Sequence, residues 1–100
     1  MPYIKGKDRI NIDATLEPIQ DYILRKYAAG EKINAGELNY VLSSIIHGWV
    51  TASPKICYAV MNEAMGALEC AKLEFYRTVM APYEDEKRTK NGSVSLLDDA

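Results

Sequence analysis

Three carboxylates, Glu63, Glu69 and Glu74, lie in a segment whose apolar residues have helical spacing. Helical magnesium-dependent nucleotide hydrolases hold the metal with carboxylates three or four residues apart on facing helices, so that several oxygens converge on it. Glu63 and Glu74 share a helix face but are three turns, about 16 Å, apart, and Glu69 points elsewhere. A magnesium-dependent nucleotide hydrolase, with these glutamates contributed across subunits, is therefore an alternative hypothesis.

Tyr40, Ser43 and His47 form a second polar group, on one side of a predicted helix. A phenol, a hydroxyl and an imidazole on adjacent turns can bind a polar ligand or a phosphate, or they can form a partly exposed flank with His47 hydrogen-bonded to a neighbour. His47 is the only histidine, and the sequence has neither a Gly-x-Ser-x-Gly elbow nor a glycine-rich phosphate loop. Because a nucleophile needs a base beside it, this pattern favours a protein that is not an enzyme.

A third group follows one narrow helix face. Asn62, Gly66, Glu69, Leu73 and Tyr76 all lie within about 40° of their mean direction at 100° per residue. Gly66 costs roughly 1 kcal/mol in a helix interior, so a close approach of a second helix or of a ligand would explain it. Both interpretations stay open.

The ligand-binding set that we predict is Tyr40, Ser43, His47, Asn62, Glu69, Tyr76 and Arg77. In this hypothesis Arg77 binds a phosphate, Tyr40 or Tyr76 stacks on a base, and Asn62 or Glu69 reads the edge of that base. The alternative for Arg77 is an ion pair with Glu74, three residues earlier, which is the commoner role for such an arginine.

The region from Pro54 to near Ala81 predicts one long helix. Its apolar residues recur at steps of three and four and form the stripe Cys57, Met61, Ala64, Leu68, Ala71, Phe75 and Val79. Further apolar residues lie on its other faces, which favours a helix shared with a second chain. Ser53 is expected to cap this helix and Pro54 to take its first position. Pro82 lacks the N–H that an α-helix needs, so the helix is expected to kink or stop near Ala81.

An earlier helix is expected from about residue 14 to residue 29. Asp13 or Thr15 would cap it, and Gly30 would end it. The residues before it, 1–12, are interpreted as a short basic N-terminal arm.

A further helix is expected between these two, from Asn34 to about Ala52. Asn34 and Glu37 have the spacing of a capping box, with Asn in place of Ser or Thr. The wide apolar face of this helix consists of Leu38, Val41, Leu42, Ile45, Ile46 and Trp49.

Together these elements predict an all-α fold, a small helical bundle with one long central helix that is completed by oligomerisation. Residues 84–91 are expected to add a short helix that stops at Gly92. A single domain would span residues 1–100, with residues 93–100 as a loose C-terminal tail.

Composition excludes several classes of protein. The net charge of -2 gives no electrostatic case for nucleic acid, and the helix after Ser53 carries too few basic residues for a helix-turn-helix. No apolar run is long enough to span a membrane and the N-terminus lacks the hydrophobic region of a signal peptide, so a cytoplasmic location is expected. Cys57 and Cys70 would be about 20 Å apart on one helix, which excludes a disulfide between them. With one histidine and no Cys-x-x-Cys, no zinc site or other cofactor is expected.

Four segments resemble a family of small uncharacterised proteins, a domain of unknown function from bacteriophage, prophage and bacterial genomes. The likeness covers about residues 35–92 and lies in Ala35–Tyr40, Asn62–Arg77, Ala81–Lys87 and Asn91–Gly92. The resemblance implies a phage or bacterial origin and nothing about activity. By analogy with other small helical phage proteins, such a chain can bind a host protein or sequester a nucleotide signal used in host defence.

The leading hypothesis from the sequence is a non-enzymatic, homo-oligomeric helical protein of phage type in the host cytoplasm. It would bind a small polar ligand such as a nucleotide, or a host protein, at a subunit interface. The alternatives are the magnesium-dependent hydrolase and a purely structural protein–protein interaction module.

Overall fold

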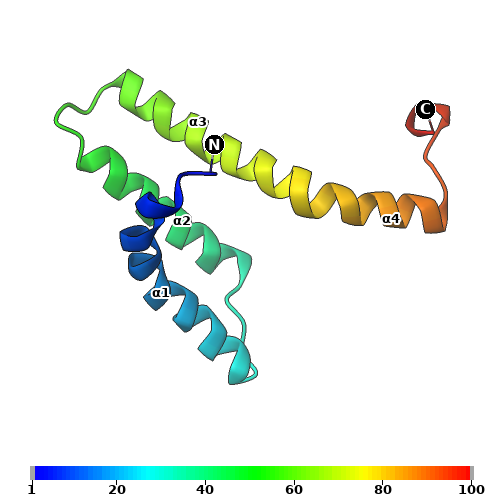
Figure 1. Cartoon of the computed structure of the whole chain (residues 1–100), viewed down its shortest axis with the longest axis horizontal. Helices are drawn as coiled ribbons and strands as arrows, with labels where there is room; N and C mark the ends of the chain where they lie inside the picture. The colour runs from blue at the N-terminus through cyan, green and yellow to red at the C-terminus, as the bar shows by residue number, and fades with distance from the viewer. Residues whose placement is uncertain (1, 100) are drawn as a thin grey trace. The chain divides into compact units, whose positions relative to one another are not determined.

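The structure, a computed structural model, describes residues 2–99, and the secondary structure in that range is entirely helical (Figure 1). The order of elements is α1 (Gly6–Ala28), α2 (Ala35–Thr51), α3 (Tyr58–Phe75), the π-helix η1 (Tyr76–Met80), α4 (Ala81–Asn91) and the 3₁₀-helix η2 (Leu96–Asp98). This confirms the predicted all-α class. The contacts divide the chain into two units, Tyr3–Ala64 and the residues from Met65 onwards together with Pro2.

Helix α1 begins at Gly6, so the predicted start near Ala14 is wrong. Lys5 occupies the N-cap position in place of Asp13 or Thr15, and the N–H of Asp8 donates to the Lys5 carbonyl over 2.9 Å. A glycine at the first helical position does not carry the cost of a glycine in the interior, and Asp8 in the first turn suits the helix dipole. Most of the expected N-terminal arm is therefore helical.

The first turn of α2 is stabilised by a complete capping box. The backbone N–H of Glu37 donates to Asn34 Oδ1 over 2.8 Å, and the backbone N–H of Asn34 donates to Glu37 Oε1 over 3.1 Å. Two backbone donors that a helix start leaves without partners are thereby satisfied. The capping prediction is confirmed, and the helix ends at Thr51, next to the predicted Ala52.

The connection from α2 to α3 differs from the prediction. Ser53 does not cap α3, because its hydroxyl donates to the carbonyl of Lys55 over 3.1 Å and so closes a turn. Pro54 therefore lies in the connection, and α3 begins at Tyr58. The N–H of Met61 donates to the Cys57 carbonyl over 3.1 Å, at the start of this helix.

Helices α3 and α4 are joined by a π-helical turn instead of a break. The N–H of Ala81 donates to the Tyr76 carbonyl, five residues earlier, where an α-helix would use the carbonyl four residues earlier. Pro82 has no N–H to donate and its ring would clash with the carbonyl four residues back, so a widened turn accommodates it at the start of α4. Gly92, with a φ of 94°, ends α4 as predicted.

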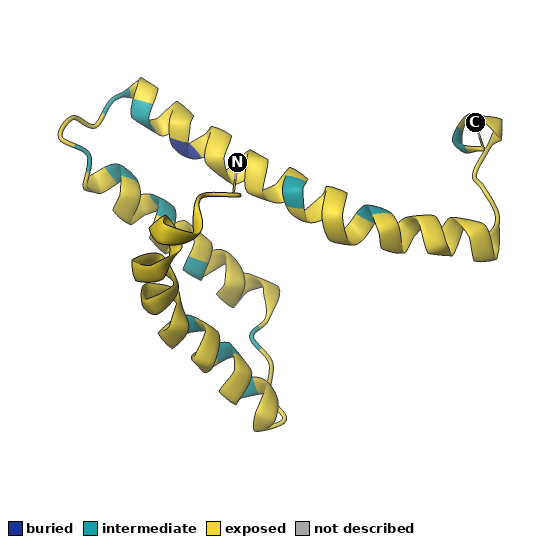
Figure 2. Cartoon of the chain, viewed as in Figure 1, coloured by how far each residue is buried: buried dark blue, intermediate teal, exposed yellow. Residues whose placement is uncertain are grey.

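Neither unit encloses a hydrophobic core of its own. Among the described residues only Ala64 is buried, at 4% exposure (Figure 2). The large apolar side chains of α1, α2, α3 and α4 are half-buried or exposed. If either unit is considered alone, the exposed fractions of these side chains can only be larger. Each unit therefore has amphipathic helices whose apolar faces lack packing partners. None of the helices in residues 2–99 has the length and apolar character to cross a membrane.

Candidate functional site

An apolar stripe on α2 is the first candidate surface. We define it as Leu38, Leu42, Ile45 and Trp49, which follow one another at steps of four, three and four residues. At 100° per residue these four positions lie within about 60° of one another. All four side chains are exposed. A seam of this spacing is typical of helices that pack along another helix.

The predicted polar residues of α2 lie on one face and are exposed. Tyr40 is 75% exposed. The Ser43 hydroxyl donates to Asn39 Oδ1 over 2.9 Å, which is a bond within the helix. His47 is also exposed, and its backbone carbonyl accepts from Thr51 Oγ1 over 2.7 Å. The arrangement is open to solvent, and none of the three residues lines any of the three hollows described in residues 2–99.

In the unit that begins at Met65, the predicted ligand residues already pair with neighbours. Glu69 forms an ion pair with Lys72 at 3.1 Å. Arg77 donates from Nη2 to Glu74 Oε1 over 2.7 Å, so the ion pair weighed as its alternative role is present.

Tyr76 also has a partner in this unit. The Glu84 carboxylate forms a hydrogen bond with the Tyr76 phenol, and this bond together with the negative charge of Glu84 raises the pKa of Tyr76 above its ordinary value. Asn62, the remaining predicted residue, is exposed on α3 within the unit Tyr3–Ala64.

The three glutamates considered for magnesium do not form a metal site within the described residues. No group of three or more His, Cys, Asp or Glu side chains in residues 2–99 is arranged to hold a metal ion. Glu69 and Glu74 each form an ion pair with a basic residue three positions later. Within one chain, the three glutamates therefore do not converge on a single metal ion.

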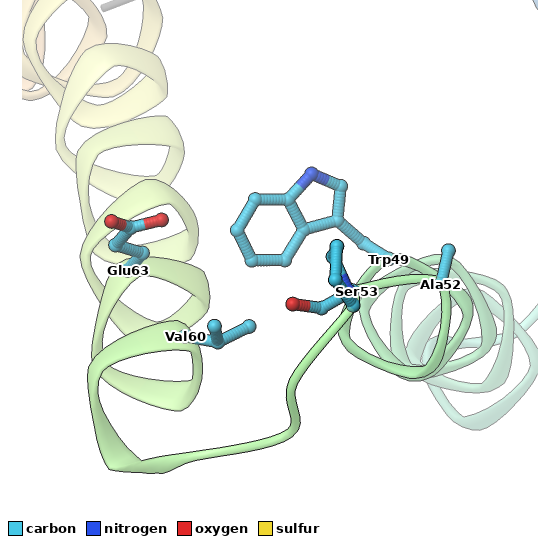
Figure 3. A pocket seen from close by; sticks show the side chains of 6 residues that line it. Trp49, Ala52, Ser53, Val60 and Glu63 are labelled. Carbon is cyan, nitrogen blue, oxygen red and sulfur yellow. The ribbon is translucent and has the colours of Figure 1, made fainter.

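A hollow beside Trp49 was not foreseen from the sequence. We call it the Trp49 hollow; its volume is about 360 Å³ and it is lined by Trp49, Ala52, Ser53, Pro54, Val60 and Glu63. Figure 3 shows the indole extending from α2 toward α3, with the Glu63 carboxylate on the α3 side. The hollow forms because the short turn at Ser53 brings the end of α2 back to the first turns of α3. The sequence signal for this hollow is the pair Ser53–Pro54, which we interpreted as a helix start and which instead lies in the turn.

The expected C-terminal tail contains a hydrogen-bonded turn around η2. Asp98 accepts from the N–H groups of Ser95 over 2.8 Å and Val94 over 3.0 Å, and these bonds lower the pKa of its carboxyl. Arg88 Nη1 donates to the Asp98 carbonyl over 2.5 Å, which attaches the turn to α4. The side chains of Val94, Leu96 and Leu97 are almost fully exposed.

Comparison with known proteins gives a family for nearly the whole chain. The model of a domain of unknown function, DUF6899, matches residues 1–94. The chain belongs to the DUF6899 family. Neither a curated protein nor a solved structure matches it. The resemblance to a domain of unknown function is thus confirmed, and DUF6899 membership by itself assigns no activity to any residue.

Proposed function

We propose that this DUF6899 chain is a non-enzymatic helical association module whose core forms when copies of the chain pack together. The observation that carries the proposal is that Ala64 alone is buried among residues 2–99. Folding about a hundred residues costs on the order of 100 kcal/mol or more in conformational entropy, which burial of apolar surface must offset. Small domains that cannot bury enough surface alone commonly do so by oligomerisation.

The α2 stripe is the surface on which we place this association. Leu38, Leu42, Ile45 and Trp49 have the spacing of a coiled-coil seam, and a second copy supplies an identical stripe. Met61 on α3, which lies in the same unit as α2, is also exposed and adds to the apolar surface that a second copy can cover. This arrangement supports the predicted homo-oligomer and the interaction-module hypothesis together.

The first test is the mass of the purified full chain by native mass spectrometry and analytical ultracentrifugation. We expect a multimer whose dissociation follows dilution. A chain that stays monomeric at all concentrations and is still cooperatively folded overturns the proposal, whatever any variant does.

The second test places a charge on the α2 stripe. Ile45→Asp is expected to weaken association by about ten-fold or more, because the carboxylate would lose its hydration in the interface. Ser44→Asp is the matched control, since it puts the same charge on the neighbouring, exposed position of the same helix. Circular dichroism reports whether each variant keeps its helices. Equal weakening by both substitutions contradicts the assignment of the stripe.

The finer hypotheses from the sequence stay predictions. Nucleotide binding by the seven-residue set, anti-defence sequestration, binding of a host protein, phage origin and a cytoplasmic location have no further support from the geometry. Because Glu69, Tyr76 and Arg77 already have partners, we rank association above ligand binding. Magnesium-dependent turnover of a nucleoside triphosphate that is lost in Glu69→Gln would establish the hydrolase instead.

A further inference from the structure

We infer that the Trp49 hollow is a binding site for an organic cation of the alkylammonium or guanidinium type. Two of its six lining residues carry this inference. Trp49 presents the aromatic ring with the strongest attraction for cations, and Glu63 presents a carboxylate to the same space (Figure 3).

Among residues 2–99, the charge of Glu63 has no counter-ion. Of the ion pairs and hydrogen bonds among residues 2–99, none involves the Glu63 side chain. By contrast, Glu69 and Glu74 on the same helix each pair with a basic residue. Glu63 is therefore available to a cation from outside the chain.

The remaining walls suit the carbon part of such a ligand. Ala52, Pro54 and Val60 are apolar, and Trp49 is 51% exposed, so its ring is accessible from solvent. The volume of about 360 Å³ falls at the lower end of the roughly 300–1,000 Å³ that small-molecule pockets occupy. An alkyl chain can lie against this apolar wall with its charged end between the indole and the carboxylate.

The test uses n-butylammonium, which carries the charged end of a lysine side chain, and 1-butanol as its uncharged counterpart at equal ionic strength. Trp49 is the only tryptophan, so the indole N–H gives a single reporter signal in the NMR spectrum of the full chain. We expect a weak but saturable shift with n-butylammonium that added salt reduces, and a smaller, non-saturating change with 1-butanol.

Glu63→Gln is expected to weaken n-butylammonium binding roughly three-fold, the loss of one exposed ion pair. Glu86→Gln makes the same chemical change on α4 and is expected to leave binding unchanged. An equal response to the amine and the alcohol, or an unchanged response in Glu63→Gln, overturns the inference. Each variant is titrated separately, and circular dichroism checks that Glu63→Gln keeps its helices. If it does not, Glu63→Asp supplies the conservative comparison.

The indole N–H signal of Trp49 also shows whether the natural cation is a free amine or a basic side chain of a second copy. For a free amine, the wild-type indole signal stays constant with protein concentration until n-butylammonium is added. For a basic side chain of a second copy, the signal moves with protein concentration, and Glu63→Gln reduces that dependence. Binding of n-butylammonium to a monomeric chain would support the cation site while overturning the proposed association, so the two failures are distinguishable.

Discussion

Arg77 and Glu74 form an ion pair at 2.7 Å, between the last turn of α3 and the first turn of η1. This pair occupies the guanidinium that a phosphate-binding role would require. Because the Arg77 side chain is 67% exposed, the pair is expected to stabilise the fold only slightly, by about 0.3–0.5 kcal/mol. A double-mutant cycle of Arg77→Ala and Glu74→Gln in urea denaturation measures that coupling.

The matched pair for this cycle is Glu69 with Lys72, which has the same three-residue spacing. We expect the two coupling energies to agree, and neither pair to affect calorimetric titration with nucleotides. A loss of measurable nucleotide binding in Arg77→Ala, with binding intact in Lys72→Ala, would instead restore the ligand-binding hypothesis.

Asn34→Ala is expected to lower the free energy of unfolding by about 1 kcal/mol. The substitution removes the oxygen that accepts the Glu37 N–H at the start of α2. Asn34→Asp keeps an accepting oxygen and is expected to remain near the wild-type stability. Thermal and urea denaturation of the three proteins check this order, and an equal loss in both variants would mean that the accepting oxygen is not the source of the stabilisation.

Pro82→Ala is expected to replace the π turn by regular α-helix with little change in stability. The new N–H at position 82 can donate to the Thr78 carbonyl, a gain of roughly 0.5–1.5 kcal/mol. Loss of the proline makes the unfolded chain more flexible and offsets about 0.4–1 kcal/mol of that gain. Amide hydrogen exchange checks the change through protection of the new N–H at position 82. An unprotected amide at position 82 would contradict the explanation.

The C-terminal turn is expected to open in acid. The N–H groups of Ser95 and Val94 hold the pKa of Asp98 below its ordinary value of 3.8. The stabilisation by this carboxylate is therefore complete above pH 3.8 and is lost as the pH falls through the lower pKa of the folded turn. The amide chemical shifts of Ser95 and Val94 follow the transition, and Asp98→Asn is expected to abolish it. A midpoint at or above 3.8 would show that these bonds do not form in solution.

The parts of the fold that depend on local patterns were predictable. The capping box at Asn34 and Glu37, the stop at Gly30 and the stop at Gly92 each follow from one or two residues, and all are present. The start of α1 is an exception, because Gly6 takes the first helical position inside the segment that we expected to be an N-terminal arm.

The predictions that differ from the structure concern residues that can play more than one local role. Ser53 before Pro54 resembles a helix start, but the hydroxyl can also close a turn, and here it does. Pro82 indicated a defect in the helix without specifying its kind, because a stop, a kink and a π turn all accommodate a missing N–H. The Trp49 hollow depends on the path of that turn, so no pattern within α2 alone could indicate it. For Arg77, the carboxylate three residues earlier predicted its partner in the structure, and the expected phosphate did not.

The small number of buried side chains in residues 2–99 also has a consequence for how long the protein survives in a cell. A module that completes its core only by association has a stability that depends on its own concentration. Newly made chains below the association threshold would expose their apolar faces to proteases, while chains above it would be protected. Expression level would then act as a switch, and the protein would accumulate only when it is made faster than single chains are degraded.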